Sequence, residues 1–227
     1  YGVDLSMTKA ERLVARESAL THAMCLTGVD LVDGAPRRWR VENSWGEETA
    51  EKMAREVSEA REAKDSVGGV ISCRVYGLPA GLGEPLYDKL TSRLASAMLG
   101  INAARGFELG EGFALASMRG SVANDPFHLN AEGRVAQVTN RGGGTLGGIT
   151  TGAPLTFRVA FKPTSSIGLP QETVRRDGEA VCLEITGRHD PCLTLRAVPV
   201  VEAMTALTLM DFYLLHARST QRQGGED

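Results

Sequence analysis

Three short stretches between residues 140 and 192 contain residue types that bind anionic ligands. The first, 140–152, reads NRGGGTLGGITTG and contains six glycines. Glycines cost backbone entropy and add no side-chain packing, so such a run indicates that the backbone comes close to a ligand. The second, 161–166, reads FKPTSS and supplies one ammonium group and three hydroxyls. Together with free backbone N–H groups, these are the donors that suit a phosphate.

The third stretch, 187–192, reads GRHDPC and places a cation, an imidazole and a carboxylate in consecutive positions: Arg188, His189 and Asp190. A plainer interpretation stays open, in which the glycines form an ordinary loop and Arg188 and Asp190 a surface ion pair. The order strand, Gly-rich turn, helix of a dinucleotide site is absent, and so is the lysine of a P-loop.

Further motifs follow one another along the chain. They read DSVGGV at 65–70, GLGEP at 81–85, SAMLGINA at 96–103, GEGFA at 110–114, MRGS at 118–121 and RAVPVVEAM at 196–204. With the three stretches above, this series resembles chorismate synthase from about Glu51 to His216. The resemblance is to the C-terminal part of that enzyme, because the N-terminal Gly-Glu-Ser-His-Gly block, a second histidine block and an Arg-Ser-Ser block have no counterpart.

The resemblance implies an α+β fold with helices sandwiched between antiparallel sheets, and a homotetramer. It implies conversion of 5-enolpyruvylshikimate 3-phosphate to chorismate by 1,4-elimination of phosphate, with reduced FMN required and not consumed. Asp190 and Arg188 match the catalytic positions. The family's flavin contacts match Asn102, Ala103, Gly147, Lys162, Pro163, Thr164, Ser165, Ser166 and Arg188. Without the resemblance, Asn102 reads as a residue that caps a helix or turns the chain.

Residues 1–47 resemble a different family. The motifs MTKAERL at 7–13, THAM at 21–24 and ENSWG at 42–46 are similar to the bleomycin hydrolase branch of papain-like cysteine peptidases. By that resemblance, His22 matches the catalytic base and Asn43 the residue that orients it. The nucleophile has no match, since Cys25 follows His22 by only three residues. Proteolysis is therefore not expected, because an activated nucleophile needs both members of the pair.

The two resemblances meet near residues 47–52 and divide the chain into 1–48 and 49–227. We interpret this junction as a fused or misassembled reading frame or an artificial chimera. Because residue 1 is Tyr and no signal-peptide pattern follows, the chain is also predicted to be a fragment.

Composition excludes several classes of protein. The chain has 227 residues, of which 42% are hydrophobic and 23% charged, and a net charge of −3. This balance gives no electrostatic case for nucleic acid or an anionic membrane, and no apolar run is expected to be long enough to span a bilayer. None of the four cysteines forms a Cys-x-x-Cys pair, so neither a metal site nor disulfides are expected, and reduced thiols in a cytoplasmic protein are favoured.

Hydrophobic periodicity predicts the elements that would hold these motifs. Two strands are expected at Ala23–Leu31 and Arg38–Trp45, joined by a turn. Loops are expected at 121–137 and 168–178. A helix starting at Pro85 is expected to bury Leu86, Leu90, Leu94, Ala97 and Ile101. The other predicted elements are a helix at Glu48–Lys64, strands at Gly69–Leu78, Leu155–Phe161 and Ala180–Ile185, and a final buried helix that Pro199 begins and that runs from Val200 to Ala217.

The sequence therefore favours an FMN-dependent lyase of the chorismate synthase family, represented by its C-terminal part and inactive alone. The first alternative is a fragment that binds flavin without catalysis, which flavin absorbance without product would identify. The second is a papain-like peptidase fragment, which would require labelling of Cys25 by an active-site thiol reagent in a manner that depends on His22.

Overall fold

A three-stranded antiparallel sheet lies at the centre of the fold, with β9 in the middle of the order β3-β9-β4. These strands span Gly69–Val75 (β3), Leu155–Phe161 (β9) and Ala104–Leu109 (β4). Side chains of β3 and β9 alternate between buried apolar and more exposed residues, so the sheet has one apolar face. The computed structural model describes residues 24–32, 35–43 and 47–223.

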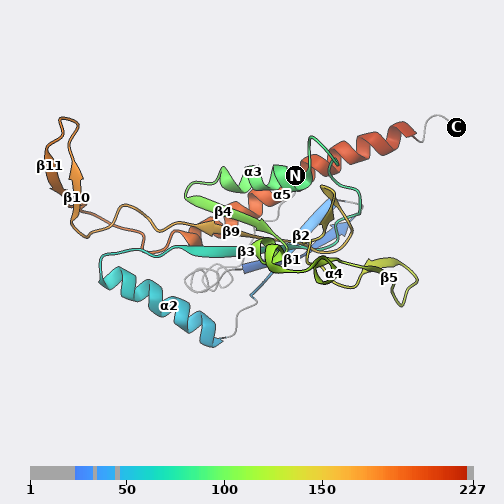
Figure 1. Cartoon of the computed structure of the whole chain (residues 1–227), viewed down its shortest axis with the longest axis horizontal. Coiled ribbons are helices and arrows are strands. Elements are labelled where there is room, and N and C mark those ends of the chain that lie inside the picture. The colour runs from blue at the N-terminus through green and yellow to red at the C-terminus, as the bar shows by residue number, and fades with distance from the viewer. Residues whose placement is uncertain (1–23, 33–34, 44–46, 224–227) are drawn as a thin grey trace.

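Two helices cover the apolar face of this sheet (Figure 1): α3, Leu90–Leu99, and α5, Thr194–Gln223. Leu90, Leu94 and Met98 of α3 are fully buried at helical spacing. On α5, the side chains of Val201, Leu209 and Phe212 are buried on one face of the helix. The largest side chains that the sheet contributes to this core are Ile71, Val75, Leu155, Phe157, Val159 and Phe161. The mixed helices and antiparallel sheet confirm the predicted α+β class.

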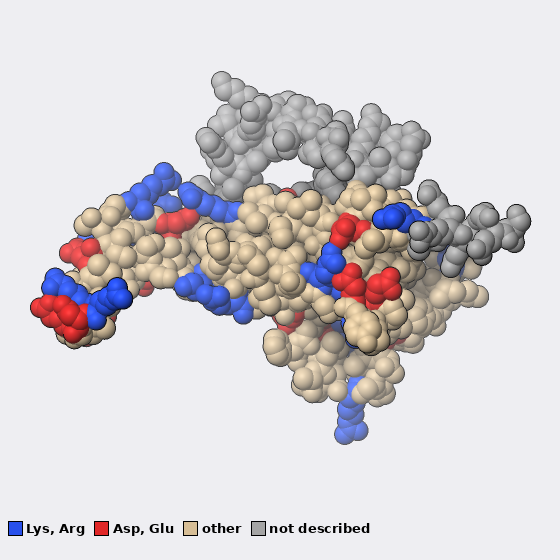
Figure 2. Space-filling model, turned by 90° about the horizontal axis from the view of Figure 1, so that it is seen from above, with Lys and Arg blue, Asp and Glu red and all other residues tan. Residues whose placement is uncertain are grey.

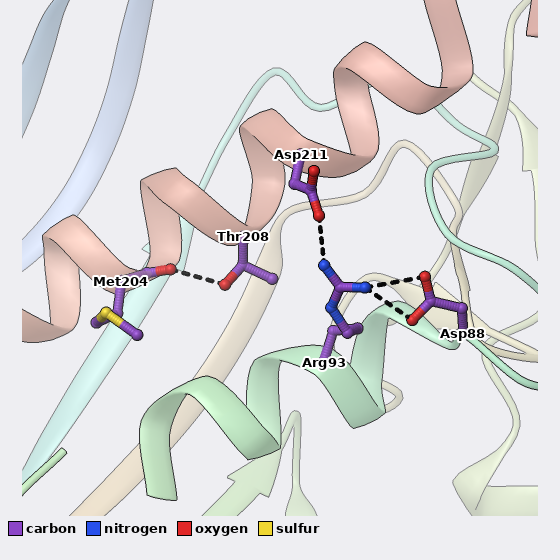
Figure 3. A network of polar contacts seen from close by, with 5 residues as sticks. All are labelled: Asp88, Arg93, Met204, Thr208 and Asp211. Atoms are coloured by element: carbon purple, nitrogen blue, oxygen red, sulfur yellow. Dashed lines mark hydrogen bonds and ion pairs between the residues drawn. The ribbon is translucent and has the colours of Figure 1, made fainter. Parts of the chain in front are cut away.

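One arginine joins the two helices (Figure 3). Arg93 of α3 donates to both carboxylate oxygens of Asp88, at 3.1 and 3.0 Å, and forms an ion pair with Asp211 of α5. Its guanidinium also lies 5.3 Å from the centroid of the Phe212 ring. The hydrogen bond to Asp88 raises the pKa of Arg93, and partial desolvation opposes this less strongly. Nearby in α5, the Thr208 hydroxyl donates to the Met204 carbonyl at 2.8 Å.

The remaining elements lie around this core. Helix α2 lies below the sheet in the view of Figure 1, β1 runs beside β3, and the β10–β11 hairpin projects from the body. Seen from above, charges of both signs lie at the hairpin end of the molecule and again on the other side of its middle, with a mostly uncharged surface between them (Figure 2). The bounds are β1 Met24–Val32, β2 Ala35–Asn43, α2 Glu47–Glu62, η1 Gly112–Ser117, α4 Gly120–Ala123, β5 Phe127–Leu129, β6 Val135–Gln137, β7 Thr145–Leu146, β8 Ile149–Thr150, β10 Gln171–Val174 and β11 Ala180–Leu183.

Helix α5 differs from the expectation in two ways. It begins at Thr194 and contains Pro199, whereas Pro199 was expected to begin it. Pro199 is the sixth residue of the helix, so it removes the one backbone hydrogen bond that its N–H would have donated to the Leu195 carbonyl. By length and composition alone, Thr194–Arg218 is also apolar enough to cross a membrane, contrary to the expectation from the sequence. The core helix of a soluble protein can have the same length and apolar composition. In α5, 33% of the apolar stretch is buried inside the structure.

Other predicted boundaries were wrong because contacts with other segments of the chain decide them. Helix α3 starts at Leu90, because Leu90 donates its N–H to the carbonyl of Gly148, and Leu86 is exposed. Residues 168–178 contain β10, which pairs with β11. Residues 121–137 contain the β5–β6 hairpin, and β2 begins before the expected turn has ended. The predictions for α2, β1, β3, β9 and β11 are confirmed to within a few residues.

Candidate functional site

Residues 162–166 follow the end of β9 and lie against the corner that follows α3. The N–H of Lys162 donates to the carbonyl of Ala103 at 3.0 Å. Ala103 has a φ of 68°, a left-handed conformation that is uncommon for a residue with a side chain. The structure therefore brings two predicted groups of site residues together, the Asn102–Ala103 corner and the Lys162–Ser166 loop.

The polar groups of this loop face one another and the solvent. Lys162 Nζ donates to Ser165 Oγ at 2.9 Å, so an ammonium and a hydroxyl already converge. Lys162, Ser165 and Ser166 are exposed. The Thr164 hydroxyl oxygen, in contrast, is buried without a hydrogen-bond partner among the described residues. A buried polar atom without a partner is costly, so a ligand or water that reached Thr164 would recover that cost.

The segment before β3, which contains Ser66 and Gly68, contacts the 162–166 loop and the end of β9. Ser66 Oγ donates to the Thr164 carbonyl at 2.7 Å. A Cβ on Gly68 would lie 2.5 Å from the Phe161 carbonyl oxygen, and one on Gly69 would lie 2.9 Å from Thr194 Oγ1. Only glycine allows this close approach, so the pair Gly68–Gly69 has a structural reason.

The loop at 187–192 is attached to the same segment. The N–H of Val67 donates to the Pro191 carbonyl at 2.8 Å, which links the loop to the residues beside Ser66. Asp190 is paired with Arg196 at the start of α5, with 3.1 Å between Oδ2 and Nε. Arg188 is exposed. His189 Nε2 lies 3.0 Å from the Ile185 carbonyl oxygen, so this ring has a structural contact.

Gly147 is separated from the other predicted flavin contacts. It is exposed in the β7–β8 turn with a φ of 63°, and the neighbouring Gly148 carbonyl accepts the N–H of Leu90, the first residue of α3. Asn102 follows the other end of that helix. At a rise of about 1.5 Å per residue, the two ends of α3 are about 15 Å apart. The structure therefore does not place Gly147 beside Asn102, and only a ligand that extends along α3 would reach both.

The two predicted peptidase residues lie at or beyond the edge of the described part of the chain. His22 lies outside the described residues, and Asn43 is the last residue of β2. In the described part of the chain, no group of three or more His, Cys, Asp or Glu side chains is placed to hold a metal ion.

Sequence reasoning missed a cavity at the opposite end of the sheet. This cavity has a volume of about 680 Å³, and its lining includes Arg74, Arg141 and Arg158. Alternation along β9 would have placed Arg158 on the polar face of the sheet. The meeting of the three arginines depends on the register between segments far apart in the sequence, which periodicity does not reveal.

Comparisons with known proteins identify relatives over most of the chain. The family profile described as chorismate synthase matches residues 17–214. Chorismate synthase of Porphyromonas gingivalis is 56% identical over 158 residues, which are 70% of this chain and 43% of the relative. That of Opitutus terrae is 53% identical over 166 residues, 73% of this chain and 46% of the relative. A crystal structure of chorismate synthase superposes with a TM-score of 0.60 and 30% identity, covering 74% of this chain and 44% of that one.

These comparisons bear on two interpretations of the sequence. The chain spans about half the length of the curated relatives that it matches, at 43% and 46% of the two relatives named above. The peptidase resemblance of the N-terminal stretch finds no support. The family profile begins at residue 17 and so extends into that stretch.

Proposed function

We propose, because this chain belongs to the chorismate synthase family, that it is part of a lyase that forms chorismate from 5-enolpyruvylshikimate 3-phosphate with reduced FMN. The reaction is a 1,4-elimination that removes phosphate and one ring hydrogen. The observation that carries the proposal is a loop bonded to the Ala103 corner in which the Lys162 ammonium contacts the Ser165 hydroxyl and the buried Thr164 hydroxyl has no partner among the described residues.

The donor set fits the phosphate of FMN. Lys162 supplies a positive charge. The hydroxyls of Thr164, Ser165 and Ser166 supply neutral donors in the same five-residue loop. The Thr164 hydroxyl has no other hydrogen-bond partner among the described residues, so binding would not have to break an internal bond there. Hydrogen bonds between charged donors and phosphate oxygens are about twice as strong as neutral ones.

The other site residues have distinct tasks in this proposal. Asn102 and Ala103 form the corner against which the flavin lies, and Pro163 holds the loop in an extended conformation. Exposed Gly147 offers backbone without a side chain to the same ligand where it extends along α3. The flavin, when bound, supplies the electronic step of the elimination, and the protein orients it.

Two residues of the 187–192 loop handle charge and protons. Arg188 is exposed and meets an anionic group of the substrate or of the flavin. Asp190, held in place by Arg196, moves a proton at the reaction centre. A positioned group of this kind contributes typically about 10²–10⁴ in rate.

Turnover tests this proposal. Phosphate release from 5-enolpyruvylshikimate 3-phosphate would be measured anaerobically with reduced FMN, for this chain alone and with the N-terminal half of a relative. We expect no turnover by the chain alone and turnover in the mixture. Asp190→Asn should abolish most of it, while Asp177→Asn on the β10–β11 hairpin should not. Ordinary turnover by the chain alone, or full activity of Asp190→Asn, would contradict the proposal.

The second candidate is a flavin-binding protein without catalysis. It is favoured by the share of the relatives that this chain spans, 43% in the Porphyromonas gingivalis protein. Flavin binding without phosphate release in the mixture would select it. We further propose a cytoplasmic location and a homotetramer, the latter to be tested by sedimentation with and without the N-terminal half.

The division of the chain at residue 48 is also a proposal. If residues 1–48 are an appendage, their deletion leaves the melting temperature of the remainder unchanged or higher. Strand β1 runs beside β3, and the family profile begins at residue 17, so the alternative is a stretch that stabilises the sheet. A large drop in melting temperature would favour that alternative.

A further inference from the structure

The polar face of the central sheet has two arginines close together. Ser72 and Arg74 of β3 alternate with buried residues, as do Thr156 and Arg158 of β9. The register places Ser72 opposite Arg158 and Arg74 opposite Thr156. Arg74 and Arg158 are therefore diagonal neighbours on one face, with Cβ atoms about 7–8 Å apart. Two hydroxyl side chains lie beside them.

A third arginine reaches the same place from the Gly-rich stretch. Asp125 accepts the N–H groups of Arg141 at 2.8 Å and Gly142 at 2.7 Å, and the Arg141 carbonyl accepts the N–H of Glu111 at 2.9 Å. A Cβ on Gly110 would lie 2.1 Å from that carbonyl oxygen, so glycine is required there. The backbone at Arg141 is thus fixed against the end of β4.

Asp125 is well suited to hold this loop. Partial burial raises the pKa of its carboxyl, but hydrogen bonds from the Thr139 hydroxyl and the N–H groups of Gly142 and Arg141 outweigh this effect. Its pKa is consequently below the ordinary value. The loop that presents Arg141 is therefore held by a carboxylate that stays charged at neutral pH.

The charged side chains around this cavity are unevenly paired. Arg158 is paired with Glu108 at 2.6 Å, and Glu111 also lines the cavity. Within the described part of the chain, no acidic side chain forms an ion pair with Arg74. Asp125 adds a third carboxylate beside Arg141, so Arg74 is the guanidinium group that has no acidic partner among the described residues.

Two buried polar atoms beside the cavity also lack partners in the described structure: the Arg141 Nε donor and the Asn140 Oδ1 acceptor. The Asn140 amide nitrogen already donates to the Pro154 carbonyl at 2.7 Å, which fixes the side chain. Both atoms are buried, so a ligand or water that reached them would recover the cost of an unmade hydrogen bond.

We propose that this cavity binds a small hydroxylated molecule that carries a carboxylate or phosphate group. Arg74 and Arg141 bind the anionic group, since a guanidinium matches the geometry of either oxyanion. Asn140 Oδ1 accepts a hydroxyl of the ligand. The volume of about 680 Å³ suits a small molecule, and the net charge of −3 makes nucleic acid a poor partner. The site is separate from the flavin site, because it lies at the other end of β9 from Lys162.

Calorimetric titration of the whole chain at low ionic strength tests this proposal, with citrate and glucose 6-phosphate as probes. Binding of at least one probe is expected, and the probe that binds more tightly identifies the class of anion. Arg74→Gln should weaken that binding about tenfold or more. Arg55→Gln on α2 is the control, because Arg55 is exposed, pairs with Glu59 and does not line the cavity. Tricarballylate, which lacks the hydroxyl of citrate, should bind more weakly than citrate if citrate is the better probe.

Several results would overturn the proposal. These are no binding of either probe, an unchanged affinity in Arg74→Gln, or an equal loss in Arg55→Gln. A loss in Lys162→Ala would also overturn it, because the anion would then occupy the candidate flavin site. Arg74 is exposed, so Arg74→Gln should fold, and an unchanged melting temperature would verify that.

Discussion

The two ends of β9 offer polar groups that are satisfied in different ways. Beyond Phe161, Lys162 donates to Ser165 and Ser66 donates to the Thr164 carbonyl, whereas the Thr164 hydroxyl has no partner among the described residues. Around Thr156 and Arg158, one of three arginines has no acidic partner among the described residues, and the buried Asn140 Oδ1 and Arg141 Nε atoms lack hydrogen-bond partners there. Both regions lie on the same strand, and both depend on glycines that allow close backbone contact.

This difference separates two kinds of anion site. In the candidate flavin site, a single lysine and several hydroxyls on one short loop are preorganised by contacts with the Ala103 corner and the segment before β3. In the arginine cavity, three segments distant in sequence each contribute one cation. The first kind is visible as a continuous motif, whereas the second exists only after the strands have paired.

The largest expected loss of stability comes from a change in the hydrophobic core, which both regions share. Phe157 is 1% exposed and its ring lies 5.5 Å from that of Phe107. Phe157→Ala should cost about 3–5 kcal/mol of unfolding free energy. Urea unfolding measures this loss. Phe113→Ala, at a position that is 85% exposed, is the control and should have little effect. A small effect of Phe157→Ala would mean that the sheet does not rest on this core.

Sequence reasoning located the parts of this architecture whose information is local. The alternation of Leu155–Phe161 and the spacing of apolar residues in α2 predicted both elements, and the FKPTSS motif marked one end of β9. The start of α3 was missed because a distant carbonyl, that of Gly148, satisfies Leu90. The β10 strand was missed because only its pairing with β11 makes residues 171–174 a strand.

A smaller change should affect the arginine cavity alone. Gly110 has a φ of 56° and no room for a Cβ next to the Arg141 carbonyl. Gly110→Ala should cost about 2 kcal/mol of unfolding free energy and displace Arg141, since it combines a left-handed residue with a backbone clash. Anion binding should fall while FMN affinity stays the same. The control is Gly120→Ala, where a Cβ meets nothing within 4 Å. Equal losses of both ligands would show that the two ends are coupled.

The smallest expected effect depends on pH. Asp125→Asn removes a carboxylate that accepts bonds from Thr139, Arg141 and Gly142, and should cost about 1 kcal/mol at neutral pH. Because the folded-state pKa of Asp125 is lowered, its stabilisation is present above the unfolded pKa of about 3.9 and is lost as pH falls through the folded value. Melting temperatures of the two proteins should therefore converge in acid. Asp177→Asn serves as the matched control, and a difference that grew on acidification would contradict this role for Asp125.

The most direct test of the central claim is a flavin fluorescence titration of Lys162→Ala. If the Lys162–Ser166 loop holds the phosphate of FMN, this change should weaken FMN binding by about 1.5–3 kcal/mol, the range for hydrogen bonds to charged groups. Lys52→Ala on α2 should bind FMN as the unchanged chain does. Riboflavin, which lacks the phosphate, should lose little affinity on the same substitution. Equal affinity of Lys162→Ala and the unchanged chain for FMN would contradict the account.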